Sequence, residues 1–239
     1  MKRFLGILFL LVIVAAGVCA YFFPGIPYKY KCTHDIELTD SIWENAPEDT
    51  LALPADNADY SSFGLKITAW GDMKPQRTDD KNSVIWKNGD ESHLVSISTE
   101  RLNDNDDFLD RTGISHEALE QYCKAAEKTT PENRYEFMKL VASLTMDDFD
   151  IHSFKNSKTF YRLMKIKNEM YLGEDFPARL YCVDGVGYRG FLYTVAGSED
   201  NSALINIYPE RDKHTRYMLE ISVPDWNEAI AVARSIKLT

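Results

Sequence analysis

The N-terminal segment that ends at Pro24 constrains the fold and the location of this chain more than any other part of its sequence. An uncharged, predominantly apolar run extends from Phe4 to Phe23, directly after Lys2 and Arg3, and Pro24 follows it. Twenty residues of α-helix span about 30 Å, the thickness of the hydrocarbon core of a bilayer. The run therefore predicts a transmembrane anchor or a signal peptide over residues 1–23.

Three fates of this segment are open. The first is a retained single-pass helix, and the second is cleavage after Val18-Cys19-Ala20, whose small residues suit a signal peptidase. The third is lipidation of Cys19, which Val18 disfavours because Gly, Ala or Ser normally precedes a lipidated cysteine. The positive-inside rule places Lys2 and Arg3 in the cytoplasm. Residues 24–239 then face the periplasm or the cell exterior, on the cell membrane or secreted after cleavage. The absence of an Asn-X-Ser/Thr sequon favours a bacterial source.

The exported part of the chain is acidic. Residues 24–239 carry 37 acidic and 25 basic side chains, because Lys2 and Arg3 are the only charged residues before them, and the net charge is −12. Such a surface repels phosphate backbones, so we expect no nucleic-acid partner. A binding role of this charge predicts a basic protein partner. Nothing in the sequence calls for a cofactor.

Three cysteines, Cys32, Cys123 and Cys182, lie in this exported part. Disulfides form in oxidising compartments, and Cys123 and Cys182 both fall in regular elements of the predicted domain. We therefore predict a Cys123–Cys182 disulfide as the pairing to test. The alternative is that both are small buried thiols that never pair.

The chain after residue 23 is predicted to hold a spacer and one domain. Residues 24–62 contain four prolines and only scattered apolar residues, which is typical of an irregular segment. From residue 63 the apolar pattern becomes regular, and the chain from there to residue 239 is long enough for one sizeable core. We therefore expect a spacer over 24–62 and a single exported domain over 63–239.

Alternating and helical patterns share this domain. Alternation predicts strands over 65–69, 83–86, 93–98, 179–183, 188–195, 203–208 and 216–223, with Asn88-Gly89 as a type I′ hairpin turn. Helical spacing predicts a helix capped by Ser115, a second starting at Thr130-Pro131, a third over about 158–171, and a final helix capped by Asp225 with Glu228 in capping-box spacing. Short connections between strands predict an α+β fold, an antiparallel sheet flanked by helices.

The end of the chain resembles PsbP-like domains. A final strand precedes a capped, Ala-rich helix that ends in Ala233-Arg234-Ser235-Ile236-Lys237-Leu238, and the likeness extends from about residue 180 to the last residue. The resemblance implies an α-β-α sandwich and a role as an adaptor or stabiliser of a larger complex. The helical middle of the chain departs from this pattern, and we transfer no functional residue.

Acidic and aromatic clusters are the candidate binding residues. Asp104, Asp106, Asp107 and Asp110 form the densest acidic stretch, but Phe108 and Ile114 stand where an EF-hand needs Gly and Glu, so the calcium motif fails. We predict a protein-binding surface there; a looser calcium site and a solvated turn that leads into the following helix are the alternatives. Six aromatic residues crowd the C-terminal strands, and we expect Tyr188 on the outer face as a second binding patch.

Catalytic and metal sites are not predicted. Asp148, Asp150 and His152 alternate, but capping and loop roles explain them more simply than a metal does, and the histidines lack the spacing of a zinc site. Two functions remain. We favour a membrane-anchored exported domain that binds another protein, of the immunity, inhibitor or adaptor type. The alternative is an exported hydrolase or metal-dependent enzyme whose site uses Asp104, Asp107, Asp148 and His152.

Overall fold

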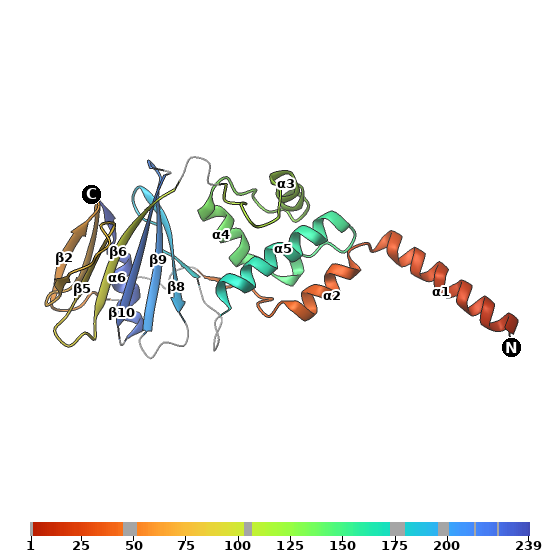
Figure 1. Cartoon of the computed structure of the whole chain (residues 1–239), viewed down its shortest axis with the longest axis horizontal. Helices are drawn as coiled ribbons and strands as arrows, with labels where there is room; N and C mark the ends of the chain where they lie inside the picture. The colour runs from red at the N-terminus through yellow and green to blue at the C-terminus, as the bar shows by residue number, and fades with distance from the viewer. Residues whose placement is uncertain are drawn as a thin grey trace. The chain divides into compact units, whose positions relative to one another are not determined.

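The computed structural model divides the chain into two compact units (Figure 1). The structure describes residues 2–44, 52–102, 107–172, 180–195, 201–212, 214–223 and 225–239. Residues 1–41 and 108–170 form the helical unit, and residues 42–107 and 171–239 form the β unit. The chain thus leaves the helical unit, builds half of the β unit, returns, and finishes in the β unit.

The helical unit contains α1 to α5. These are α1 (Lys2–Phe22), α2 (Ile26–Asp35), α3 (His116–Ala125), α4 (Arg134–Ser143), the 3-10 turn η1 (Met146–Asp148) and α5 (Phe154–Tyr171), whose last residue belongs to the β unit. The apolar stripe of α5 packs against the other helices: Phe160, Leu163 and Met164 are fully buried, as is Tyr122 of α3. Phe160, Leu163 and Met164 confirm the predicted apolar face of this helix, but Met170, predicted on the same face, is 52% exposed.

The apolar N-terminal run forms one helix, α1, and every described side chain from Phe9 to Phe23 is exposed. Among the described residues no single helix is both long and apolar enough to cross a bilayer. Phe9–Phe22 and Ile26–Asp35 together satisfy that requirement by length and composition, as a pair bent by 80°.

The β unit is built on a large, mainly antiparallel sheet, which confirms the predicted α+β class. Its strands are β1 (Trp43–Glu44), β4 (Lys74–Gln76), β5 (Ser83–Lys87), β6 (Leu94–Arg101), β7 (Leu180–Cys182), β8 (Tyr188–Val195), β9 (Asn201–Pro209) and β10 (Thr215–Val223). Their order is β1-β7-β8-β9-β10-β6-β5-β4, and among the strand pairs of the described residues only β1–β7 is parallel. A smaller sheet has the order β11-β3-β2, with β2 (Asn57–Ser62), β3 (Leu65–Trp70) and β11 (Lys237–Leu238).

The core of the β unit lies between these sheets. Helix α6 (Trp226–Arg234) packs on β9, β10 and β3, and its Ala229, Val232 and Ala233 are fully buried. Small side chains let this helix approach both sheets closely. On β10, Tyr217 and the alternate residues after it are buried while their neighbours are partly exposed. The predicted alternation of this strand is confirmed, because one face packs on the core and the other meets solvent.

Two turns differ from the prediction. Asn88-Gly89 does not form a two-residue turn: Lys87 pairs with Leu94, so the loop spans the six residues between them, and Glu91 has the positive φ of 61°. The two-residue turn occurs instead at Phe63-Gly64, where Ser62 pairs with Leu65 and both turn residues have positive φ. Both φ values are those that a type I′ turn requires.

Two helices begin at the capping residues that the sequence predicts, Ser115 and Asp225. The Ser115 side chain accepts a bond from Ala118 N, and Asp225 accepts one from Asn227 N. The second helix begins later than Thr130-Pro131, because Asn133 caps it by accepting from Glu136 N. An Asn that offers its side-chain oxygen stabilises a helix start more than a proline does.

The predicted irregular spacer over 24–62 is wrong in two places. It contains α2, whose Cys32 is fully buried, and β2, which pairs along its length with β3. Proline at the first turn of α2 is compatible with a helix, because the amide hydrogen that proline lacks has no partner there. The two-unit division also places residues 24–41 with the helices and residues 57–62 with the sheets.

Candidate functional site

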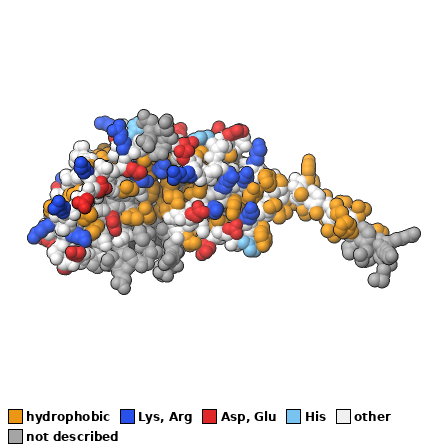
Figure 2. All heavy atoms as spheres, viewed as in Figure 1, with side chains coloured by type: hydrophobic (Ala, Val, Ile, Leu, Met, Phe, Trp, Pro, Cys, Tyr) orange, Lys and Arg blue, Asp and Glu red, His pale blue; other side chains and the backbone are white. Residues whose placement is uncertain are grey.

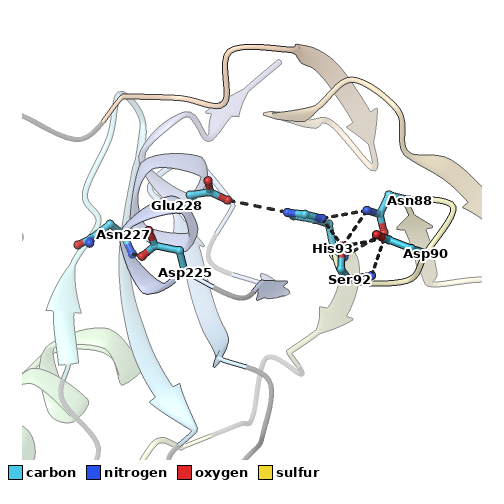
Figure 3. A network of polar contacts seen from close by, with 7 residues as sticks. All are labelled: Asn88, Asp90, Ser92, His93, Asp225, Asn227 and Glu228. Carbon is cyan, nitrogen blue, oxygen red and sulfur yellow. Dashed lines mark hydrogen bonds and ion pairs between the residues drawn. The ribbon is translucent and has the colours of Figure 1, made fainter.

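Figure 3 shows a network of polar contacts around His93, which lies in the loop between β5 and β6. The loop between β5 and β6 folds on Asn88, whose Oδ1 accepts from His93 N at 3.0 Å and whose N donates to His93 O at 3.2 Å. Asp90 Oδ1 accepts from both the N and the Oγ of Ser92, at 3.1 and 2.7 Å. These bonds to Ser92 lower the pKa of the Asp90 carboxyl. The loop is therefore fixed by its own side chains.

The His93 ring reaches from this loop toward α6. Its Nδ1 lies 2.8 Å from Ser92 Oγ and 2.9 Å from Asn88 Nδ2, and its Nε2 lies 3.9 Å from the Glu228 carboxylate (Figure 3). The Trp70 ring lies against it, with centroids 4.4 Å apart. Glu228, predicted to complete the capping box of α6, thus faces His93.

This constellation resembles a Ser–His–acid set in composition, but its hydrogen bonding opposes catalysis. A hydroxyl has one proton, and the Ser92 proton goes to Asp90, whereas a nucleophilic serine needs its proton directed at the base. Glu228 at 3.9 Å is beyond hydrogen-bond distance of the ring. The network joins α6 to the β5–β6 loop and does not form a reaction centre.

A shallow pocket of about 380 Å³ lies at one end of the β unit, and its lining residues are Phe63, Asn82, Thr99, Glu100, Arg101, Thr215 and Tyr217. Tyr217 donates its hydroxyl proton to Phe63 O at 2.9 Å, and burial raises the pKa of this phenol. The pocket offers hydroxyls, one carboxylate and one guanidinium, and no nucleophile beside a base.

The predicted acidic stretch follows β6, which ends beside this pocket. Asp104 and Asp106 lie outside the described residues. Asp107 is partly buried and Asp110 is exposed in a turn. The structure therefore tests only part of this predicted surface.

The predicted outer-face position of Tyr188 is wrong. Its side chain is 3% exposed, and its hydroxyl donates to Ile236 O at 3.0 Å. Burial raises the pKa of this phenol to about 12. In β8, Tyr188 faces the core that α6 and β11 close, so it links the end of the chain to the large sheet.

The predicted Cys123–Cys182 disulfide is wrong, because neither cysteine takes part in a disulfide. Cys123 lies in α3 of the helical unit, whereas Cys182 lies in β7 of the β unit. Cys123 is fully buried, and burial raises the pKa of its thiol. The alternative of an unpaired buried thiol describes Cys123.

The residues of the enzyme hypothesis have local structural bonds. Asp148 caps η1 by accepting from Thr145 N at 2.9 Å and pairs with Lys128 at 2.7 Å. The His152 ring lies 3.0 Å from Phe22 O and contacts Phe23. Within the described part of the chain, no three His, Cys, Asp or Glu side chains are placed to hold a metal.

A fully buried lysine is the most unusual ionisable group of the helical unit. Lys167 of α5 is 0% exposed and donates to Leu144 O at 2.7 Å and to Asp40 O. Burial lowers the pKa of its amine to about 8, against the favourable charges of Asp40 and Asp148. Its neighbour Asn168 accepts from the backbone amides of Glu37 and Leu38. These two residues hold the segment after α2 onto α5.

Two of these features were missed by sequence reasoning. Lys167 follows Phe160, Leu163 and Met164 at helical spacing, so its place on the apolar face of the helix could have predicted that it is buried. His93 had no such signal, because its partners Ser92, Asn88 and Glu228 come together only through the turn and the packing of α6.

The net acidic charge is confined to one unit. The β unit has 24 acidic and 13 basic residues, a net charge of −11, whereas the helical unit has 13 acidic and 14 basic residues, a net charge of +1. The chain total of −10 is therefore carried by the β unit alone.

Comparison with known proteins gives little further information. No family model matches the sequence, and no curated protein matches it. One solved structure with a match is a crystal structure from Bacteroides thetaiotaomicron VPI-5482, at 11% identity and a TM-score of 0.28. The match covers 74% of this chain and 45% of that one, so this chain spans less than half the length of that structure. A likeness of this size carries no inference about fold or function.

Proposed function

We propose that the protein is an exported, membrane-anchored domain whose β unit binds a basic protein and performs no chemistry. The observation that supports this most is the charge separation, −11 on the β unit against +1 on the helical unit. Opposite charge speeds the encounter of two proteins and selects against wrong partners. A role as an immunity protein, inhibitor or adaptor fits this chemistry, and an adaptor is also what the PsbP-like resemblance of the C-terminal strands and helix implies.

The anchor in this proposal is α1. The part of α1 that enters the bent pair, Phe9–Phe22, does not satisfy the requirement for a span alone, but the uncharged run of the sequence extends from Phe4 to Phe23, which is long enough. The described side chains from Phe9 to Phe23 are exposed. An exposed apolar helix of this length is costly in water, because each buried methylene group gains about 0.8 kcal/mol. Retention of this helix keeps the protein on the membrane, and cleavage at Ala20 releases it into the periplasm or medium.

Site-specific cross-linking tests the partner. A photoreactive amino acid replaces Asp72 or Asp79, both exposed on the β unit. The full-length protein is produced in bacterial cells and cross-linked in their intact envelope. We expect one discrete adduct whose partner is basic and whose yield falls in high salt. The matched control is the same substitution at Glu120, exposed on α3 of the near-neutral helical unit, where we expect no adduct. An acidic partner, or equal adducts at all three positions, would contradict the proposal.

The acidic stretch tests the electrostatic part of the proposal. Replacement of Asp104, Asp106, Asp107 and Asp110 by Asn should slow association with the cross-linked partner and leave stability within about 1 kcal/mol, as surface changes usually do. The difference between wild type and variant should shrink in high salt, because charges are screened within about 8–10 Å. Unchanged association kinetics would remove this stretch from the binding surface.

A further inference from the structure

A group of exposed apolar side chains surrounds the end of α1. The apolar rim, as we name it, consists of Phe22, Phe23, Ile26, Tyr30 and Phe154, with exposures from 39% for Phe23 to 64% for Tyr30. Figure 2 shows hydrophobic side chains along α1 and around its junction with the next helix. Large exposed apolar groups that adjoin one another mark a surface that another phase or molecule covers.

The rim is held together by Ile151 and His152, just before α5, and by Phe154, the first residue of α5. Gly25 N donates to Ile151 O at 2.9 Å, and the His152 ring lies 5.2 Å from the Phe23 ring. The Phe154 ring meets the Tyr28 ring at 5.3 Å. A Cβ on Gly25 would lie 2.8 Å from Ile151 O, so the backbones approach as closely as only glycine allows. The two halves of the rim therefore form one surface of the helical unit.

Helix α2 presents a fixed face away from α5. Cys32 is buried, and Tyr161 of α5 donates its hydroxyl proton to Asp35 at 2.8 Å, so the opposite face of α2 points outward. That outward face carries Ile26, Lys29 and Tyr30, which helical spacing brings together. Tyr30 also stacks on His34, with ring centroids 3.9 Å apart.

We propose that the apolar rim and the outward face of α2 lie in the headgroup region of a phospholipid bilayer, as a second membrane contact beside α1. Only three residues separate α1 from α2, and the two helices are bent by 80°. A spanning α1 therefore directs α2 along the membrane plane, for about 15 Å at 1.5 Å per residue. This inference rests on the proposed anchor.

The chemistry of the rim favours lipid over a protein partner. Tyr and Phe gather at membrane interfaces, where one end of the ring is apolar and the other is wet. Lys29 and Lys155 are exposed beside the rim, and lysines near an anionic bilayer surface are attracted to it. Without Lys2 and Arg3, which the proposed anchor places in the cytoplasm, the helical unit has 13 acidic and 12 basic residues, a net charge of −1, so an anionic surface repels it far less than it repels the β unit at −11.

Spin labels on full-length protein in vesicles of zwitterionic and anionic phospholipid test this contact. In a Cys19→Ser, Cys182→Ser background, which leaves only the buried Cys32 and Cys123, single labels are attached at Tyr30→Cys or Phe154→Cys. Ile13→Cys in α1 and Glu120→Cys in α3 are the reference positions. Collision with oxygen, which partitions into lipid, is compared with collision with a water-soluble nickel complex.

We expect the ratio of oxygen to nickel collision at residues 30 and 154 to lie between the high value at residue 13 and the low value at residue 120. If residues 30 and 154 favour nickel while residue 13 favours oxygen, the rim proposal is overturned and the anchor stands. If residue 13 also favours nickel, the anchor itself fails. Shielding of residue 30 from both reagents, with spin–spin broadening that disappears on dilution with unlabelled protein, would show a second copy on the rim and would also overturn the proposal.

Discussion

Replacing Lys167 by Met tests whether a charged group is held in the core of the helical unit. The amine is fully buried and donates to two backbone oxygens, and burial lowers its pKa from 10.5 to about 8. Met has a similar length without the charge. The variant removes the desolvation of the ammonium but leaves the carbonyls of Leu144 and Asp40 without their donor, which costs about 1–3 kcal/mol each.

The pH dependence of wild-type stability has a definite sign. Below pH 8 the amine is protonated in both the folded and the unfolded state, so its contribution is constant. Between pH 8 and 10.5 the unfolded state binds the proton and the folded state does not, so the free energy of unfolding rises with pH. The two pKa values differ by about 2.5, and each unit corresponds to about 1.4 kcal/mol, so the full gain is about 3–4 kcal/mol.

Urea unfolding of the full-length protein in micelles at pH 7, 8, 9 and 10 measures this gain. Circular dichroism at 222 nm weights the helices, and tryptophan fluorescence reports the β unit, because all four tryptophans lie there. We expect wild type to gain about 2–3 kcal/mol over Lys167→Met from pH 7 to pH 10. Tyrosines that titrate above pH 10 are the same in both proteins, so their contribution to stability cancels in the difference between wild type and variant. Lys158→Met, at an exposed position of the same helix, should show no such gain.

A difference between wild type and Lys167→Met that stays constant from pH 7 to 10 would refute this reasoning. It would mean that the amine keeps its ordinary pKa and therefore reaches water. If the free energy of unfolding of wild type rises with pH relative to Lys158→Met as much as it does relative to Lys167→Met, the pH dependence belongs to other groups.

Three further substitutions, one of them with a control, test the β unit by its melting temperature and tryptophan fluorescence. Ile230→Asp places an unpaired charge at a buried position of α6 and should cost more than about 3 kcal/mol; an unchanged melting temperature would remove α6 from the core. Gly190→Ala puts a Cβ 2.8 Å from Asn206 O and should cost about 1–3 kcal/mol, whereas Gly89→Ala, with nothing within 4 Å, should be near neutral. Tyr188→Phe removes the hydrogen bond to Ile236 O and should lower the free energy of unfolding by about 1 kcal/mol. An unchanged stability would contradict the buried hydrogen bond of Tyr188.

The elements that the sequence predicts well are those with one buried and one solvated face. β10 and α5 have such faces, so apolar residues recur at periods of two and of three to four along them. Caps are readable for the same local reason, since Ser115 and Asp225 bond to amides two or three residues away. Such signals depend on the chain near the residue and on little else.

Features that depend on distant segments were not predicted. β2 has no fully buried residue, so its alternation is faint, and its place beside β3 comes from the Phe63-Gly64 turn. The burial of Tyr188 follows from the chain end that returns beside β3. The Cys123–Cys182 pairing failed because the chain crosses repeatedly between units, so that regular elements of one predicted domain belong to different cores. Composition alone does not reveal such a crossing.

The two-unit division gives the charge of the chain a physical meaning that the total of −10 lacks. A uniform charge would keep every surface away from an anionic bilayer, and an apolar rim would then oppose the electrostatics around it. Here the exported part of the unit that carries the rim has 13 acidic and 12 basic residues, and 24 of the 37 acidic residues lie in the other unit. The same distribution makes the two proposals separable by salt. Screening should weaken the association of the β unit with a basic protein, whereas the insertion of Tyr30 and Phe154 into lipid rests on apolar area and should persist in high salt.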